Sequence, residues 1–291
     1  MPFWELTVSA SPETSEGLTN FLWELGALGV VEEEPAGAPL TLRAFFAETA
    51  SPSTLSAATR DYCAGLKALG FTVTGVQPTV TPVQEEVWAE AWRQAFLPRP
   101  VGRRLLVAPP WDIPAQLDGL QLVIVEPGRA FGTGSHESTQ GCLLLLECLL
   151  ETYRVTHAVD VGTGTGILAI TALLLGVPEV TALDTDPDAL REARENAERN
   201  GVGSRLHCQL SGAEVLEGRF PLLLANLLAE SHFALAPHYR RLLASSGTLI
   251  LGGLLSEEEP AVVRAMAAQG FVRLESVELE GWVSLRLAMA D

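Results

Sequence analysis

The chain has 291 residues, of which 47% are hydrophobic and 19% charged, a composition that excludes collagen-like and intrinsically disordered proteins. Its 36 acidic residues outnumber its 19 basic residues and give a net charge of −17, which disfavours binding to nucleic-acid phosphates or anionic lipid and favours a cationic partner. At this length we expect two domains.

Short strands and helices alternate through residues 1–80. The predicted order is strand 4–8, helix 11–25, strand 29–31, strand 40–47, helix 51–69 and strand 71–76. This β-α-β-β-α-β order is typical of the ferredoxin-like fold. Because the segment contains no catalytic constellation, we interpret residues 1–80 as a recognition domain.

Residues 81–100 are expected to link this domain to the rest of the chain. The pattern of residues 83–96 predicts a helix, in which Trp88 and Trp92 lie one turn apart on the same face. Core packing of the linker helix is the favoured interpretation of the two tryptophans, and a platform for the substrate is the alternative.

Residues 101–291 alternate between strands and helices on a larger scale. Helices are predicted at 140–150, 167–175 and 187–200, and strands at 105–108, 122–125, 157–161, 180–184, 205–210, 222–226, 248–251, 272–278 and 282–288. Repeated βαβ units imply a doubly wound, mainly parallel sheet. The expected fold class is therefore α/β, with a Rossmann-like domain preceded by a small α+β domain.

The strongest local signal is the sequence VDVGTGTG at residues 159–166, placed between a strand and a helix. Glycines at such a position let the backbone approach a ligand and present amides at the helix N-terminus. A dinucleotide-binding loop would read G-x-G-x-x-G, but after Gly162 and Gly164 the third glycine position holds Ile167. The spacing fits better with G-x-G-x-G, the loop of adenosylmethionine enzymes.

Asp184 ends the strand that follows the glycine loop. An acid at this carboxyl edge of a parallel sheet can accept hydrogen bonds from both ribose hydroxyls of a nucleoside. Asp186 competes for this role, but it precedes Pro187 and is better interpreted as the N-cap of the next helix. We therefore assign Asp184 as the ribose ligand.

The segment FGTGSHEST at residues 131–139 lies upstream of the glycine loop and precedes a helix. Its glycines and hydroxyls suit a loop that closes over a cofactor, with Phe131, Gly132 and Thr139 as candidate contacts. Ser138 or Thr139 would suffice as the helix cap. His136 is either a base or, as a lone histidine more often is, a hydrogen-bonded structural residue.

Asn226 is the one amide at the end of the otherwise apolar strand 222–226. This position places it at the sheet edge beside the expected cofactor. An exposed asparagine that merely ends a strand is the alternative, but the neighbouring motifs favour a catalytic and cofactor-binding role for Asn226.

The cysteines at positions 63, 142, 148 and 208 show no metal-ligand or disulfide-scaffold spacing, and we assign no metal site. Residues 1–10 lack the basic flank and apolar core of a signal peptide, and no stretch reaches the roughly 18 apolar residues that span a bilayer. We expect a cytoplasmic protein that does not bind a membrane.

Taken together, FGTGSH with Thr139, DVGTGTGILAI, LDTDP, ANLLA and the segment EEVWAEAWRQAFLPRPVGRRLLVAPPW resemble PrmA, the family of methyltransferases of large-subunit ribosomal protein eleven. The resemblance covers essentially the whole chain. It implies a class I methyltransferase domain at residues 101–291 that uses S-adenosylmethionine, behind a ferredoxin-like domain that docks the ribosomal protein. It also implies methylation of lysine ε-amines and of an N-terminal α-amine.

Carried over by position, the cofactor contacts of the family fall on Thr139, Gly162, Asp184 and Asn226, and Gly164 belongs to the same loop. The chain departs from the family with Thr163 and Thr165 for Cys and Ser, FGTGSH for FGTGTH, and Phe220-Pro221 for Phe-Asp, and the adenine contact stays unassigned. We expect a monomer with a basic ribosomal protein as substrate and no direct nucleic-acid partner.

Three alternatives stay open at this stage. One is a class I methyltransferase that acts on another protein or a small molecule. The second is a nicotinamide dehydrogenase, which Ile167 and the lack of a hydride-transfer base disfavour. The third is a protein that binds the cofactor without turnover.

Overall fold

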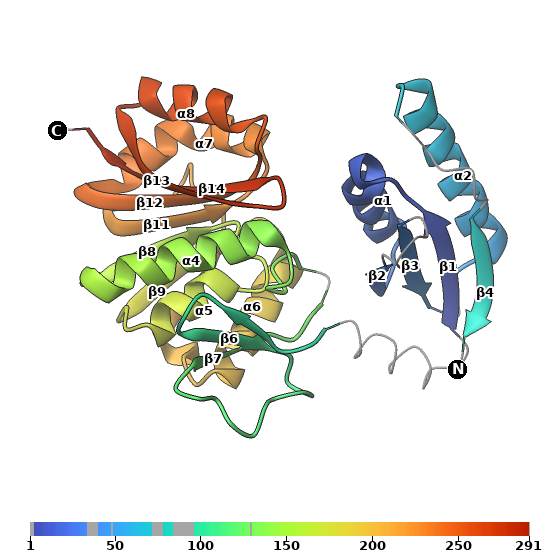
Figure 1. Cartoon of the computed structure of the whole chain (residues 1–291), viewed down its shortest axis with the longest axis horizontal. Helices are drawn as coiled ribbons and strands as arrows, with labels where there is room; N and C mark the ends of the chain where they lie inside the picture. Colours follow the sequence, from blue (N-terminus) through green and yellow to red (C-terminus); the bar gives the residue numbers. More distant parts are fainter. Residues whose placement is uncertain are drawn as a thin grey trace. The chain divides into compact units, whose positions relative to one another are not determined.

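The computed structural model describes residues 3–33, 40–47, 49–71, 78–83, 96–128 and 130–290. The chain divides into two compact units, Met1–Phe96 and Leu97–Asp291 (Figure 1).

The first unit contains a four-stranded antiparallel sheet and two described helices. Its elements are β1 (Phe3–Ser9), α1 (Pro12–Glu24), β2 (Gly29–Glu33), β3 (Thr41–Phe46), α2 (Pro52–Ala68) and β4 (Thr79–Val83). The order β2-β3-β1-β4 with antiparallel pairing gives the ferredoxin-like fold. Leu6 and Val8 alternate along β1 into the core, where they meet Leu18 and Leu22, which are one turn apart on α1.

The last strand of this unit departs from the sequence-based expectation. The structure places β4 at Thr79–Val83, across the predicted boundary at residue 80. Pro82 is tolerated because β4 pairs only with β1 and is an edge strand. Of the expected strand at 71–76, only Phe71 is described, and it is not in a strand. Most of the predicted linker helix, including Trp88 and Trp92, lies outside the described residues.

The second unit is built on a seven-stranded sheet. Its strands are β8 (His157–Val161), β9 (Glu179–Asp184), β10 (Leu206–Leu210), β11 (Phe220–Asn226), β12 (Leu243–Leu255), β13 (Phe271–Leu279) and β14 (Trp282–Met289). They lie in the order β10-β9-β8-β11-β12-β14-β13. The first five of this order run parallel, whereas β14 is antiparallel to both of its neighbours. This confirms the expected doubly wound, mainly parallel sheet.

Helices cover both faces of this sheet (Figure 1). One face carries α4 (Glu137–Thr152), α5 (Ile167–Leu174) and α6 (Pro187–Arg199), and the other carries α7 (Ala229–Leu242) and α8 (Glu259–Ala268). Alternate residues of the strands point into the two cores, as Leu222 and Leu224 do on the first face and Leu223 on the second. The last two helices, α7 and α8, are not predicted from the sequence.

A small three-stranded sheet precedes α4. It contains β5 (Arg99–Val101), β6 (Leu105–Ala108) and β7 (Gln121–Ile124) in the order β5-β6-β7. The expected strands at 105–108 and 122–125 are thus found as parallel neighbours. Arg99 and Pro100, which the sequence assigned to the linker, belong to β5 and pair with β6.

No helix among the described residues is long and apolar enough to cross a bilayer.

Candidate functional site

The carboxyl ends of β8, β9 and β11 meet at one edge of the seven-stranded sheet, here called the carboxyl edge. Gly162 follows β8, Asp184 ends β9 and Asn226 ends β11. Open α/β sheets bind ligands in the crevice outside this edge. The topology therefore gathers chemistry-bearing residues from three separate segments at a position suited to a ligand.

The loop between β8 and α5 has a conformation that requires glycine. Gly162, Gly164 and Gly166 have φ angles of +69°, +54° and +83°, in the left-handed region that other residues rarely adopt. A Cβ on Gly164 would overlap the carbonyl oxygen of Phe131, and a Cβ on Gly162 would overlap the side chain of Leu227. Both the backbone conformation and close packing explain the G-x-G-x-G spacing.

The main-chain N–H groups of this loop are bonded within the protein. From residue 162 to residue 166 they donate in turn to Leu183 O (2.9 Å), Leu183 O (2.9 Å), Asp184 Oδ2 (3.0 Å), Phe131 O (3.0 Å) and Thr163 O (2.9 Å). The amides of residues 162–166 are therefore already used within the protein, whereas the expectation that the start of α5 presents amides to a ligand stays a prediction.

Asp184 is fixed by two backbone amides. Its Oδ2 accepts from Gly164 N and its Oδ1 accepts from Asp186 N, each at 3.0 Å. Because a carboxylate offers about four lone-pair positions, each oxygen keeps acceptor capacity. Asp186 caps α6 by accepting from Asp188 N at 2.8 Å, which confirms its predicted N-cap role.

The predicted loop residues Phe131 and Gly132 pack on the glycine loop. The Thr165 hydroxyl donates to Gly132 O at 2.6 Å, in addition to the bond between Thr165 N and Phe131 O. Gly132 has a φ of +104°, and the side chain of Phe131 stays 55% exposed. The backbone of this segment is therefore fixed, whereas much of the surface of Phe131 is exposed and accessible to a ligand.

Asn226 and Thr139 meet at the same edge. Asn226 Nδ2 donates to the Oγ1 of Thr139 at 3.2 Å, and Thr139 is fully buried within α4. The carbonyl oxygen Oδ1 of Asn226 is buried and has no hydrogen-bond partner among the described residues. Leu227, the next residue, packs against Gly162 and so joins this pair to the glycine loop. An unpaired buried acceptor is costly, which makes Asn226 Oδ1 a candidate acceptor for a hydrogen bond from a ligand.

The cap of α4 is His136 rather than the predicted Ser138 or Thr139. His136 Nδ1 accepts from Ser138 N at 3.2 Å. The ring also makes edge contacts with Phe131 and Trp282, at centroid distances of 5.3 and 4.6 Å. The structural interpretation of His136 is the one these contacts favour, because Nδ1 is already occupied as an acceptor.

Asp160, which precedes the glycine loop, is a residue to which the sequence gave no role. It is 1% exposed, and its carboxylate accepts from the Thr163 hydroxyl at 2.7 Å and from the backbone of Ala169. Burial raises the pKa of Asp160 to about 7, and these hydrogen bonds oppose the rise. Asp160 thereby joins the loop and the first turn of α5 to β8. Its place two residues before Gly162 is the signal that could have identified it.

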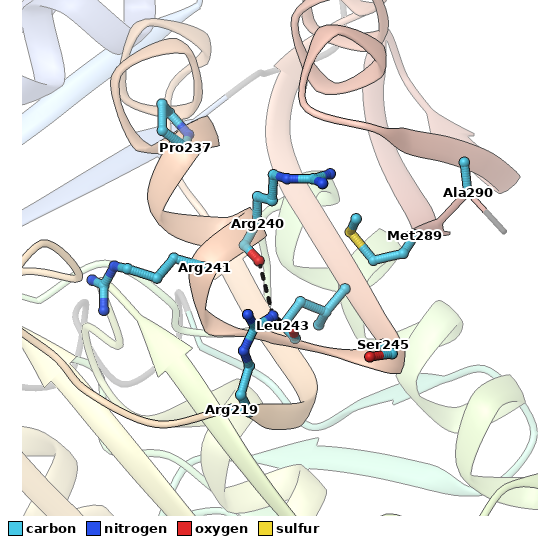
Figure 2. A pocket seen from close by; sticks show the side chains of 8 residues that line it. All are labelled: Arg219, Pro237, Arg240, Arg241, Leu243, Ser245, Met289 and Ala290. Carbon is cyan, nitrogen blue, oxygen red and sulfur yellow. Dashed lines mark hydrogen bonds between the residues drawn. The ribbon is translucent and has the colours of Figure 1, made fainter.

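A cavity of about 660 Å³ lies at the opposite edge of the sheet, where β11 and β12 begin and β14 ends (Figure 2). It is lined by Arg219, Arg240 and Arg241 together with Pro237, Leu243, Ser245, Met289 and Ala290. Each guanidinium donates to main-chain carbonyls: Arg219 to Leu243 at 2.8 Å, Arg240 to Gln269 at 2.5 Å and Arg241 to Ala213 at 2.8 Å. The cavity contains none of the predicted site residues.

Within the described ranges, no group of three or more His, Cys, Asp or Glu side chains could hold a metal ion. The residues present at the carboxyl edge do fit a nucleoside with a charged amino-acid tail, because they include acceptors for its hydroxyl and ammonium groups. The Asp184 carboxylate and the Asn226 carbonyl are the two such acceptors that the contacts define.

Comparison with known proteins identifies the family. The sequence profile described as "Ribosomal protein L11 methyltransferase (PrmA)" matches residues 2–289. The curated ribosomal protein L11 methyltransferase of Pelobacter propionicus is 34% identical over 97% of this chain and 96% of its own. That of Pelotomaculum thermopropionicum is 36% identical over 98% of each chain.

The fold agrees with these matches. The crystal structure of the ribosomal protein L11 methylase from Lactobacillus delbrueckii subsp. bulgaricus has 27% identity and a TM-score of 0.62, covering 67% of this chain and 99% of that one. With a profile match over nearly the whole chain and relatives above 30% identity over nearly their full length, this chain belongs to the ribosomal protein L11 methyltransferase (PrmA) family.

Proposed function

We propose that this chain transfers methyl groups from S-adenosylmethionine to amino groups of ribosomal protein L11, namely lysine ε-amines and the N-terminal α-amine. The observation that carries the proposal is the buried carbonyl oxygen of Asn226, which lacks a partner at the carboxyl edge while its amide nitrogen is held by Thr139. In our proposal this oxygen accepts a hydrogen bond from an N–H group of the amine.

The cofactor supplies a methyl group on a positively charged sulfur. In our proposal Asp184 accepts from the ribose hydroxyls, because both of its oxygens are fixed and retain free lone pairs. The loop with Gly162 and Gly164 forms the floor of the site, and Phe131 and Gly132 cover it. Thr139 and Asn226 lie beside the reacting amine.

The amine must lose a proton before it can attack. A lysine with a reference pKa near 10.4 costs about 4.6 kcal/mol to present in its neutral form at pH 7. Desolvation and the sulfonium charge both lower the pKa of the amine, whereas an adjacent carboxylate would raise it. Asn226 suits this task because its carbonyl orients the amine without the full negative charge that would stabilise the ammonium. Holding the amine nitrogen about 3–3.5 Å from the methyl carbon, in line with the bond to sulfur, then provides most of the rate acceleration.

The partner is a basic ribosomal protein. A net charge of −17 attracts such a protein over long range and raises its encounter rate. In the proposed division of labour, the ferredoxin-like unit recognises the substrate, residues 81–100 link the units, and the second unit performs the transfer. We further propose that the protein acts as a monomer in the cytoplasm without direct contact with nucleic acid.

The direct test is methylation of purified L11 with labelled S-adenosylmethionine. We expect label in L11, and a mass spectrum of the product gives the number and position of the methyl groups. Asn226→Ala should lower kcat by about a hundredfold and leave the affinity for S-adenosylmethionine, measured by calorimetry, within about twofold. Unchanged kcat with weakened cofactor binding would contradict the catalytic role of Asn226. Label in other proteins but not in L11 would contradict the substrate.

A further inference from the structure

We propose that His232 and Tyr239 of α7 are positioning residues for Asn226 in methyl transfer. The inference rests on the proposed function of Asn226. Both side chains are fully buried (0% exposed) beneath the carboxyl edge, so neither is placed to touch the substrate. They act instead through the backbone of β12, which lies next to Asn226.

The two side chains form a chain of hydrogen bonds with a defined direction. His232 Nε2 lies 2.9 Å from the carbonyl oxygen of Gly252, and its Nδ1 lies 3.1 Å from the Tyr239 hydroxyl. A carbonyl can only accept, so Nε2 must carry the proton. In the neutral ring Nδ1 is then an acceptor, and the Tyr239 hydroxyl donates to it.

Burial keeps both groups neutral. It lowers the pKa of His232 to about 4, although hydrogen bonds to the backbone of Gly252 and Leu227 oppose this shift, and it raises the pKa of Tyr239 above its ordinary value. The ring therefore retains one donor and one acceptor throughout the neutral pH range. The direction of the hydrogen bonds does not change there.

Gly252, where this chain of bonds ends, is the direct neighbour of Asn226. The two residues are register partners in the parallel pairing of β11 with β12. Gly252 O also accepts from Leu227 N at 3.2 Å, and a Cβ on Gly252 would lie only 2.9 Å from Asn226 Oδ1. The Gly252 peptide, to which His232 is bonded, therefore lies directly beside the side-chain amide of Asn226 and limits its position.

Asn226 is consequently supported from two sides. On one side Thr139 of α4 accepts from its Nδ2, and on the other the Gly252 backbone is bonded to His232 of α7. Without the bond from Nε2, the Gly252 carbonyl loses one of its two described hydrogen bonds, the other being from Leu227 N, and is freer to rotate. Because transfer needs the amine aligned within fractions of an ångström, a small shift of Oδ1 should slow turnover without changing cofactor binding.

The test uses the full chain with L11 and S-adenosylmethionine. His232→Leu should lower kcat by about tenfold or more, with the calorimetric affinity for S-adenosylmethionine within about twofold of the parent. His232→Gln should restore most of kcat, because its amide nitrogen can donate to Gly252 O. His238→Leu is the matched control, because this histidine lies on the same helix without a described hydrogen bond, and it should leave kcat unchanged.

Tyr239→Phe removes a single oxygen and carries the test should His232→Leu fail to fold, as judged by circular dichroism. It should lower kcat by a smaller factor than His232→Leu. Parent-like kcat in folded His232→Leu or, where that variant does not fold, in Tyr239→Phe would overturn the inference.

A double variant separates this inference from the proposed function. If His232 acts through Asn226, His232→Leu should have little further effect on the residual rate of Asn226→Ala. Independent, multiplying losses would overturn the positioning role while leaving the proposed function intact. Parent-like turnover of Asn226→Ala itself would instead refute the proposed catalytic role, and the inference with it.

Discussion

The two edges of the same sheet hold their polar groups in opposite states. At the carboxyl edge, the carbonyl oxygen of Asn226 is buried and has no partner in the part of the chain that the structure describes. At the opposite edge, Arg219, Arg240 and Arg241 surround a cavity, but each already donates to main-chain carbonyls. The difference teaches that a cavity lined by charged side chains is no sign of a reactive site when those side chains are already bonded, whereas Asn226 combines an unmet acceptor with a position beside the glycine loop.

The largest effect expected from this comparison concerns the charge at position 226. Asn226→Asp keeps the size of the side chain but places a carboxylate beside the amine, which raises the pKa of the amine. We expect kcat at pH 7 to fall by about a hundredfold, given the cost of removing the proton. The loss should shrink as the pH is raised. A pH profile of kcat parallel to that of the parent would break the argument for a neutral acceptor.

The next effect concerns the cofactor. Asp184→Ala should weaken the affinity for S-adenosylmethionine by about tenfold to a hundredfold, because hydrogen bonds to a charged acceptor contribute about 1.5–3 kcal/mol. Isothermal calorimetry measures this directly. Asp186→Ala is the matched control, since Asp186 caps α6 and should affect stability more than binding. Normal binding by Asp184→Ala would refute the ribose assignment.

A third effect concerns stability and pH at Asp160. Its pKa in the folded protein, about 7, exceeds the ordinary value of 3.8, chiefly because of burial. The folded state therefore binds the proton more tightly than the unfolded state. This contribution to stability is fully present below about pH 3.8 and is lost as the pH rises through 7. Asp160→Asn should flatten this decline in denaturant unfolding measured from pH 5 to pH 8. An unchanged slope would show that Asp160 is ionised in the fold.

The smallest effect should come from the opposite edge. Arg241→Ala removes hydrogen bonds to the carbonyls of Ala213 and Leu216 on a surface-exposed side chain. We expect the melting temperature to fall by about 2–4 °C, the shift that about 1 kcal/mol produces in a domain of this size, and kcat to stay within about twofold. A large loss of methyl transfer in a folded variant would contradict the claim that only the carboxyl edge takes part in the reaction.

Much of the second unit could be predicted because local signals agreed there. Strand β8 has the predicted bounds, and α6 carries Asp186 before it and Gly201 after it as expected. Asp184 was identifiable because a parallel sheet brings the residue that ends one strand close to the loop after its neighbour.

Other features depend on tertiary context that local patterns do not contain. Proline at position 82 argues against a strand by local propensity. Strand β4 nevertheless includes Pro82, because one side of an edge strand has no neighbouring strand and needs no backbone N–H donor. His136 caps α4 although Ser and Thr follow it, since only the folded loop reveals where Nδ1 points. Helix α7 contains Pro237, which argues against a helix by propensity, and its buried His232 could not be linked to Gly252 without the register of β12.

The hydrogen bonds within the glycine loop determine when the loop becomes ordered. Since the N–H groups of residues 162–166 are bonded to the protein itself, the loop takes its shape during folding and not on encounter with a ligand. The conformational entropy of the loop is therefore lost during folding. Ligand binding does not have to offset that loss, so rearrangement of the loop takes little from the binding free energy.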